Sequence, residues 1–164
     1  MDKKKAIHSI FFWALIAVIG MTVIFIFSNS LIPPEESGKL TGEIGEVISG
    51  VIPPESGIGS FISKYVGKVA HFSEYGLLGI EVAVFVYFYL QKCYKWGPLS
   101  LFGAMLVALI DETIQYIPGR TASVFDVWLD VGGFAFFSII TYALLYLSAY
   151  IVRRLRSKRE DTEN

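Results

Sequence analysis

The chain has 164 residues, of which 54% are hydrophobic and 15% aromatic, and its mean hydropathy is +0.55. This composition is too apolar for a soluble domain of that length, so we expect one membrane domain over residues 1–164. The formal net charge is −1, and Cys93 is the only cysteine, which excludes an intrachain disulfide.

Four apolar segments approach the roughly 20 residues that a membrane-spanning helix needs. They cover about residues 7–27, 66–90, 99–116 and 124–152. We therefore predict an all-α polytopic membrane protein. A signal peptide is the competing interpretation of the first segment, because three lysines precede it. Its apolar stretch is longer than the roughly 7–15 residues of a signal sequence and no small-x-small cleavage site is obvious, so we expect a retained anchor.

The basic residues predict the orientation. Ten of the 14 lysines and arginines lie before the first segment, between the second and third, or after the fourth. With four spans these places share one side, so we expect both termini in the cytoplasm, a cytoplasmic tail at 153–164 and an outer loop at 28–65. The tail is typical of a topology and anionic-lipid signal, and we expect no nucleic-acid partner. Its polar end, 157–164, is predicted to be disordered.

The outer loop contains a short repeat, in which Ile32-Pro33-Pro34-Glu35 recurs as Ile52-Pro53-Pro54-Glu55. Each copy is predicted to form a turn that precedes a helix, with Ser or Glu near the helix N-terminus. Apolar residues at helical spacing after the first copy predict a short amphipathic helix on the outer membrane surface or on the bundle.

Polar and ionisable residues gather at the outward ends of the last three spans. They are Lys68, His71, Glu74, Tyr75, Asp111, Glu112, Gln115, Arg120, Ser123, Asp126 and Asp130. A rise of about 1.5 Å per residue places them within roughly the outer 15 Å of the membrane. Because ionisable groups are costly in lipid, we expect one polar layer that faces the bundle interior.

We expect the residues of this polar layer to have two kinds of role. Acid/base chemistry is assigned to His71, Glu74, Asp111, Glu112 and Asp126. Substrate binding is assigned to Lys68, Tyr75, Gln115, Arg120, Ser123 and Asp130. Five carboxylates cannot all be ionised cheaply against two cations, so some would share a proton or a cation. A structural ion-pair network is the alternative. The deeper Glu81 would relay protons or simply pair with His8 or Thr22.

Two motifs resemble the VanZ-like family of bacterial integral membrane proteins. They are Lys68-x-x-His71-Phe72-x-Glu74-Tyr75 and Asp111-Glu112-x-x-Gln115-x-x-Pro118-Gly119-Arg120-x-x-Ser123-x-x-Asp126. The resemblance covers the whole chain. It implies a cell-envelope role in the bacterial cytoplasmic membrane, because the name-giving member is associated with low-level resistance to the glycopeptide teicoplanin. Asp130 departs from the pattern, since relatives usually carry Asn there, and the glycine expected near Phe137 is missing.

Three functions remain open. The layer could act on an envelope lipid or a lipid-linked precursor, with no cofactor. It could do so with zinc or manganese bound by His71, Glu74, Asp111 and Asp126. It could instead bind a glycopeptide, a lipid headgroup or a partner protein without catalysis. Transport ranks last because four spans are few for a transporter, and the sequence leaves the oligomeric state open.

Overall fold

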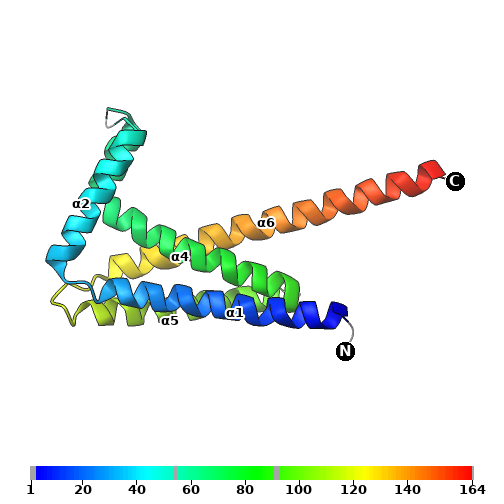
Figure 1. Cartoon of the computed structure of the whole chain (residues 1–164), viewed down its shortest axis with the longest axis horizontal. Coiled ribbons are helices and arrows are strands. Elements are labelled where there is room, and N and C mark those ends of the chain that lie inside the picture. Colours follow the sequence, from blue (N-terminus) through cyan, green and yellow to red (C-terminus); the bar gives the residue numbers. More distant parts are fainter. Residues whose placement is uncertain (1–2, 54, 91–92, 164) are drawn as a thin grey trace.

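The computed structural model describes residues 3–53, 55–90 and 93–163, which form helices joined by short loops. In chain order the elements are α1 (Lys3–Ser30), α2 (Pro34–Val51), α3 (Gly57–Lys64), α4 (Val66–Phe85), the π-helical turn η1 (Val86–Leu90), α5 (Cys93–Gln115) and α6 (Val124–Glu163). Figure 1 shows their arrangement. The part of the chain described contains no strand, so the all-α prediction is confirmed.

Four of these helices are long and apolar enough to cross a membrane, and the chain is a multi-pass membrane protein. The segments are Ile7–Ser30, Val66–Leu90, Lys95–Gln115 and Val124–Arg159. The third begins four residues before the predicted start at Leu99. Its helix continues through Pro98, which lies within the first two turns.

The fourth helix is longer than predicted. The sequence 157–163 was expected to be disordered, but α6 continues unbroken to Glu163. Lysine, arginine and glutamate are good helix formers, and this stretch contains neither glycine nor proline to stop the helix. In Figure 1 the C-terminal part of α6 extends beyond the other helices.

The tightest packing joins α4 to the first half of α6, where glycines let the two backbones approach. A Cβ added at Gly79 would meet the Phe134 carbonyl oxygen, and one added at Gly133 would meet the Phe72 carbonyl oxygen. The Ser138 hydroxyl donates to the Gly79 carbonyl at 3.0 Å across the same contact. Small residues at such contacts are a common basis of helix association in membranes.

The remaining helices complete a core around this pair. α1 packs against both α4 and α5, and α5 packs against α6. The buried apolar residues that join them include Ile26, Tyr75, Ala108, Val127 and Phe134. The core therefore lies at the half of the bundle where α1 and α5 end and α4 and α6 begin. We call this half the site end.

Both copies of the repeat precede a helix, as predicted. Pro34 is the first residue of α2, where its missing N–H costs no hydrogen bond. The Ser56 side chain caps α3 by accepting from the Gly59 N–H at 2.9 Å. Pro54 lies outside the described residues. The predicted amphipathic helix is α2, which stands at a steep angle to the bundle at the site end and has no fully buried residue (Figure 1).

Candidate functional site

The predicted polar residues of α4 and α6 form successive pairs, because both helices begin at the site end and run in the same direction. In the pair nearest the helix starts, the Lys68 Nζ lies 3.0 Å from the Asp126 Oδ1. About one turn deeper, the His71 Nδ1 lies 3.7 Å from the Asp130 Oδ1. The close contact of Gly133 with the Phe72 backbone follows. The glycine contact thus sets the distance at which the histidine meets the aspartate.

His71, Asp111 and Asp130 form the buried centre of the site. Asp111 and Asp130 are 0% exposed, and His71 is partly buried between them and the surface. One nitrogen of the histidine and one oxygen of each aspartate all lie within 4.8 Å of one another. Ser30, at the end of α1, donates its hydroxyl to the Asp111 Oδ1. We call these three residues the buried triad.

Most of the polar atoms of the buried triad have no hydrogen-bond partner among the described residues. These atoms are the His71 Nδ1, the Asp111 Oδ2 and both carboxylate oxygens of Asp130. The Tyr75 hydroxyl and the Gln115 Nε2 are also buried; both lie near the Asp111 carboxylate, but neither makes a hydrogen bond of good geometry. Buried polar groups are nearly always hydrogen-bonded in folded proteins, so this concentration marks a place that structure alone does not explain.

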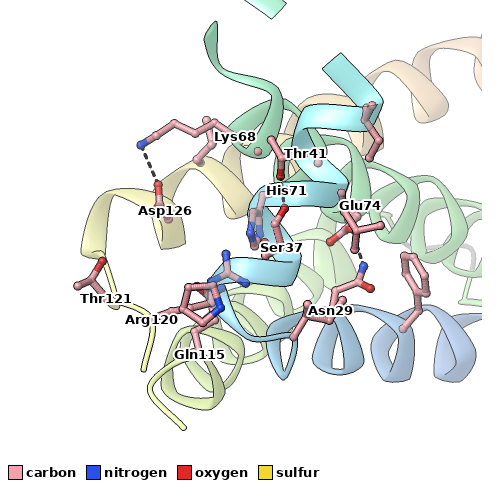
Figure 2. A pocket seen from close by; sticks show the side chains of 18 of the residues that line it. Asn29, Ser37, Thr41, Lys68, His71, Glu74, Gln115, Arg120, Thr121 and Asp126 are labelled. Carbon is pink, nitrogen blue, oxygen red and sulfur yellow. Dashed lines mark hydrogen bonds and ion pairs between the residues drawn. The ribbon is translucent and has the colours of Figure 1, made fainter. Parts of the chain in front are cut away.

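A cavity of about 690 Å³ adjoins the triad at the site end. Its polar lining comes from α1, α2, α4, the end of α5, the α5–α6 loop and α6: Asn29, Ser37, Thr41, Lys68, His71, Glu74, Gln115, Arg120, Thr121 and Asp126 (Figure 2). Of the triad, only His71 reaches the cavity wall. Ser37 and Thr41 were not among the predicted site residues. Their spacing of four residues on an otherwise amphipathic helix was the available signal.

The two cations of the site differ in how they are held. Lys68 is paired with Asp126, but the two side chains are 47% and 28% exposed. An ion pair with that exposure contributes about 0–1 kcal/mol to stability and exchanges readily for another anion. Arg120 lines the cavity, and within the described residues no carboxylate lies within ion-pair distance of its guanidinium.

The Arg120 position is fixed by its backbone. Gly119 adopts a φ of +86°, a left-handed conformation that favours glycine. The Arg120 N–H then donates to the Gln115 carbonyl at 3.1 Å and closes the end of α5. The side chain is thereby directed into the cavity, where Figure 2 shows it near His71.

The remaining predicted residues lie apart from the triad. The Asn29 Nδ2 donates to the Glu74 Oε1 at 2.8 Å in the cavity wall. Glu112 lies outside the cavity lining, and its Oε2 accepts from the Ser123 N–H at 2.7 Å, just before α6 begins. Glu81 accepts from the Thr22 hydroxyl at 2.9 Å, which is one of the pairings predicted for it.

The metal-ligating set predicted from sequence was His71, Glu74, Asp111 and Asp126. The structure brings together only two of these residues, His71 and Asp111, and adds Asp130. Glu74 is turned to Asn29 and Asp126 to Lys68. Asp126 and Asp130 lie on the same face of α6, one turn apart. The deeper residue, Asp130, is therefore the one that reaches His71.

An apolar groove of about 520 Å³ adjoins the polar cavity. It is lined by Phe61, Tyr65, Lys68, Val69, Phe72, Phe125 and Leu129. Lys68 and Leu129 belong to both linings. The Lys68 ammonium lies 4.6 Å from the centre of the Phe125 ring and 3.0 Å from the Asp126 Oδ1, so its charge is held at the boundary between the groove and the cavity.

Comparison with protein families matches residues 11–147 to the VanZ/LLP1 family. The match covers most of the chain, and the chain belongs to this family. Comparison with curated proteins and with solved structures found no match. The resemblance predicted from the two motifs is therefore confirmed at the level of the family.

Proposed function

We propose that this VanZ/LLP1 protein binds the anionic headgroup of a membrane lipid or lipid-linked envelope precursor in its polar cavity. The observation that carries the proposal is the junction of the cavity with the apolar groove at Lys68 and Leu129. An amphiphile has the matching construction, since a charged headgroup is joined directly to an apolar chain. A soluble anion would use only the polar half.

The cations suit a phosphate or carboxylate headgroup. Arg120 offers a planar guanidinium that can donate two parallel hydrogen bonds to such a group. Lys68 supplies a second positive charge once the ligand displaces Asp126 from it. Asn29, Ser37 and Thr41 add neutral polar side chains around the same space. They suit the hydroxyl and amide groups of a larger headgroup.

The basic residues described above support an orientation in which the site end faces outward in a bacterial cytoplasmic membrane. The ligand would then come from the outer leaflet, where envelope precursors are used. Membership of the family supports a link between the protein and glycopeptide resistance. Bound precursor or headgroup would alter how teicoplanin reaches the cell wall. Direct binding of the glycopeptide is the competing version of this role.

A catalytic role is the second candidate, and the position of His71 favours it. His71 lines the cavity, and a carboxylate faces its Nδ1 from the buried side at 3.7 Å. A carboxylate on one ring nitrogen orients an imidazole as a general base toward the other side. In that role His71 would accept a proton from a water molecule or hydroxyl group that attacks the bound headgroup.

Native mass spectrometry of the purified full chain tests headgroup binding. The probes are phosphatidylglycerol and phosphatidylcholine with identical acyl chains, so that only the headgroup differs. We expect wild type to bind phosphatidylglycerol at least fivefold more tightly. Lys68→Gln and Arg120→Gln should each reduce that preference severalfold. Lys64→Gln is the matched control, because Lys64 is exposed one turn earlier and lines neither cavity.

Two results would contradict the proposal. One is equal affinity of wild type for both lipids. The other is a preference for phosphatidylglycerol that falls equally in Lys64→Gln and Lys68→Gln, because that would indicate general surface charge. Adding teicoplanin to the same samples tests direct binding of the glycopeptide. In that case teicoplanin binds to the protein, and the lipid does not compete with it.

A further inference from the structure

Two members of the buried triad, Asp111 and Asp130, lie behind the cavity wall and are not needed to bind a headgroup. Asp111 and Asp130 do not line the cavity, and neither is exposed. The cations that a headgroup would meet, Lys68 and Arg120, lie on the cavity side. The two aspartates therefore require a separate explanation.

Among the described residues, no lysine or arginine lies within ion-pair distance of either aspartate. The Asp130 Oδ1 lies 3.7 Å from the His71 Nδ1, an Asp111 oxygen lies within 4.8 Å of an Asp130 oxygen, and neither Asp130 oxygen has a hydrogen-bond partner in the described part of the chain. Asp111 has one oxygen held by Ser30, and the other lies near the Tyr75 hydroxyl and the Gln115 amide without a hydrogen bond of good geometry. Burying charged groups without partners is strongly unfavourable, and such groups are found paired or bound to metals.

We propose that His71, Asp111 and Asp130 bind a divalent cation, zinc or manganese, between α4, α5 and α6. Each residue offers one ligand atom, and the three atoms lie within 4.8 Å of one another. Two ligands of a tetrahedral zinc ion at about 2.1 Å are separated by about 3.4 Å, which is close to the observed 3.7 Å between the His71 Nδ1 and the Asp130 Oδ1.

The charge and the supporting contacts also fit. Two carboxylates balance a divalent ion, and a neutral imidazole adds the nitrogen ligand that both metals accept. Ser30 donates to one oxygen of Asp111 and leaves the other free for the ion, as the outer residues of metal sites commonly do. Because His71 also lines the cavity, the ion would lie next to the bound headgroup.

Metal binding is tested on the full chain in detergent, stripped with a chelator and then titrated separately with Zn²⁺ and Mn²⁺. Metal content is measured by elemental analysis after gel filtration, and thermal unfolding is followed in parallel. We expect about one ion of at least one metal per wild-type chain, with a raised Tm. Asp130→Asn and His71→Gln should each weaken binding at least tenfold. Glu81→Gln is the control, since Glu81 is also a buried carboxylate with one bonded oxygen but does not belong to the buried triad.

The stability readout distinguishes a metal site from a structural network. In chelator, Asp130→Asn should be at least as stable as wild type, because it removes a buried carboxylate that has no partner. In metal, only wild type and Glu81→Gln should gain Tm. If Asp130→Asn does not fold, His71→Gln carries the same test.

The proposal is overturned if wild type binds neither metal stoichiometrically, or if both triad variants bind as tightly as Glu81→Gln. The lipid preference described above is measured in chelator. Failure of metal binding and failure of headgroup binding are therefore separate results.

Discussion

The chain has two histidines, and they lie at opposite ends of the helical bundle. His8, near the start of α1, is exposed and contacts the Tyr89 ring edge-on at a centroid distance of 4.7 Å. The Tyr89 hydroxyl donates to the His8 backbone carbonyl at 3.1 Å, and Phe11 and Phe12 surround the pair. His71 at the site end instead faces two buried aspartates.

The comparison indicates that the residues packed around a histidine determine its role. Among the described residues, the contacts recorded for His8 are the Tyr89 ring and the Tyr89 hydroxyl on its backbone carbonyl. At the site end acidic groups from two helices converge on one ring, and their polar atoms lack partners. In the part of the chain that the structure describes, six of the seven buried polar atoms without a partner belong to His71, Tyr75, Asp111, Gln115 and Asp130, and the seventh is the Glu81 Oε2. Such a concentration at the site end is the pattern expected when that end carries function.

The largest expected effect comes from exchanging the two histidines for alanine in turn. Under the proposed role, expression of the protein raises the tolerance of cells to teicoplanin. We expect His71→Ala to abolish that gain, while His8→Ala leaves it within about twofold. The reason is that His71 links the cavity to the buried triad, whereas His8 contacts neither. The measurement is the inhibitory concentration of teicoplanin in expressing cells, with membrane levels of both variants checked by blotting.

The comparison between the two ends fails if both variants lose tolerance equally at equal expression. It also fails if His71→Ala loses only its folding, seen as aggregation on gel filtration while His8→Ala stays monodisperse. That second result would favour the structural ion-pair network over a functional layer.

A smaller effect is expected from the glycines that set the α4–α6 distance. Gly133→Ala places a methyl group against the Phe72 carbonyl and should destabilise the protein by about 1–3 kcal/mol. Gly132→Ala is the matched control, since nothing lies within 4 Å of its added Cβ. Alanine favours a helix over glycine by up to about 1 kcal/mol, so the control should be neutral or stabilised. Denaturant or thermal unfolding in detergent measures both.

If Gly133→Ala is as stable as Gly132→Ala, the close contact does not set the separation of α4 and α6. If it is destabilised as expected, metal and lipid binding by the surviving folded protein should weaken as well. The His71–Asp130 distance depends on that contact one turn away, whereas no such loss is expected at the His8 end.

The depth of the polar layer could be predicted from sequence, but the pairing within it could not. Hydropathy places the spans, and the rise of a helix then places Lys68, Asp111 and Asp126 at one level. Which aspartate meets His71 depends on the rotation and separation of α4 and α6. That separation follows from Gly79 and Gly133 packing against backbone atoms. These contacts join distant parts of the sequence, and helical periodicity does not reveal them.

The position of α2 is a second example. Its amphipathic pattern predicted a helix near the outer surface, and a helix is found there. The pattern does not give the angle at which α2 meets the bundle, which is set by the short loops on either side and by contact with α4. The contributions of Ser37 and Thr41 to the cavity were missed for this reason.

The smallest expected effect concerns Thr22, which marks the inner limit of the site. Glu81 lies ten residues after His71 on α4, about 15 Å farther along the helix, and Thr22 is the partner the structure gives it. Thr22→Val keeps the shape of the side chain but removes the hydroxyl that donates to the Glu81 carboxylate. We expect a loss of about 1 kcal/mol in stability, with metal and headgroup binding unchanged. Ser28→Ala is the control, because its hydroxyl bonds only to the Ile24 carbonyl of its own helix, and it should stay near wild type. Thermal unfolding and the two binding assays on the same samples give the result.

A loss of binding in Thr22→Val that exceeds its loss of stability would extend the functional layer down to Glu81. An unchanged affinity would place its boundary at the buried triad.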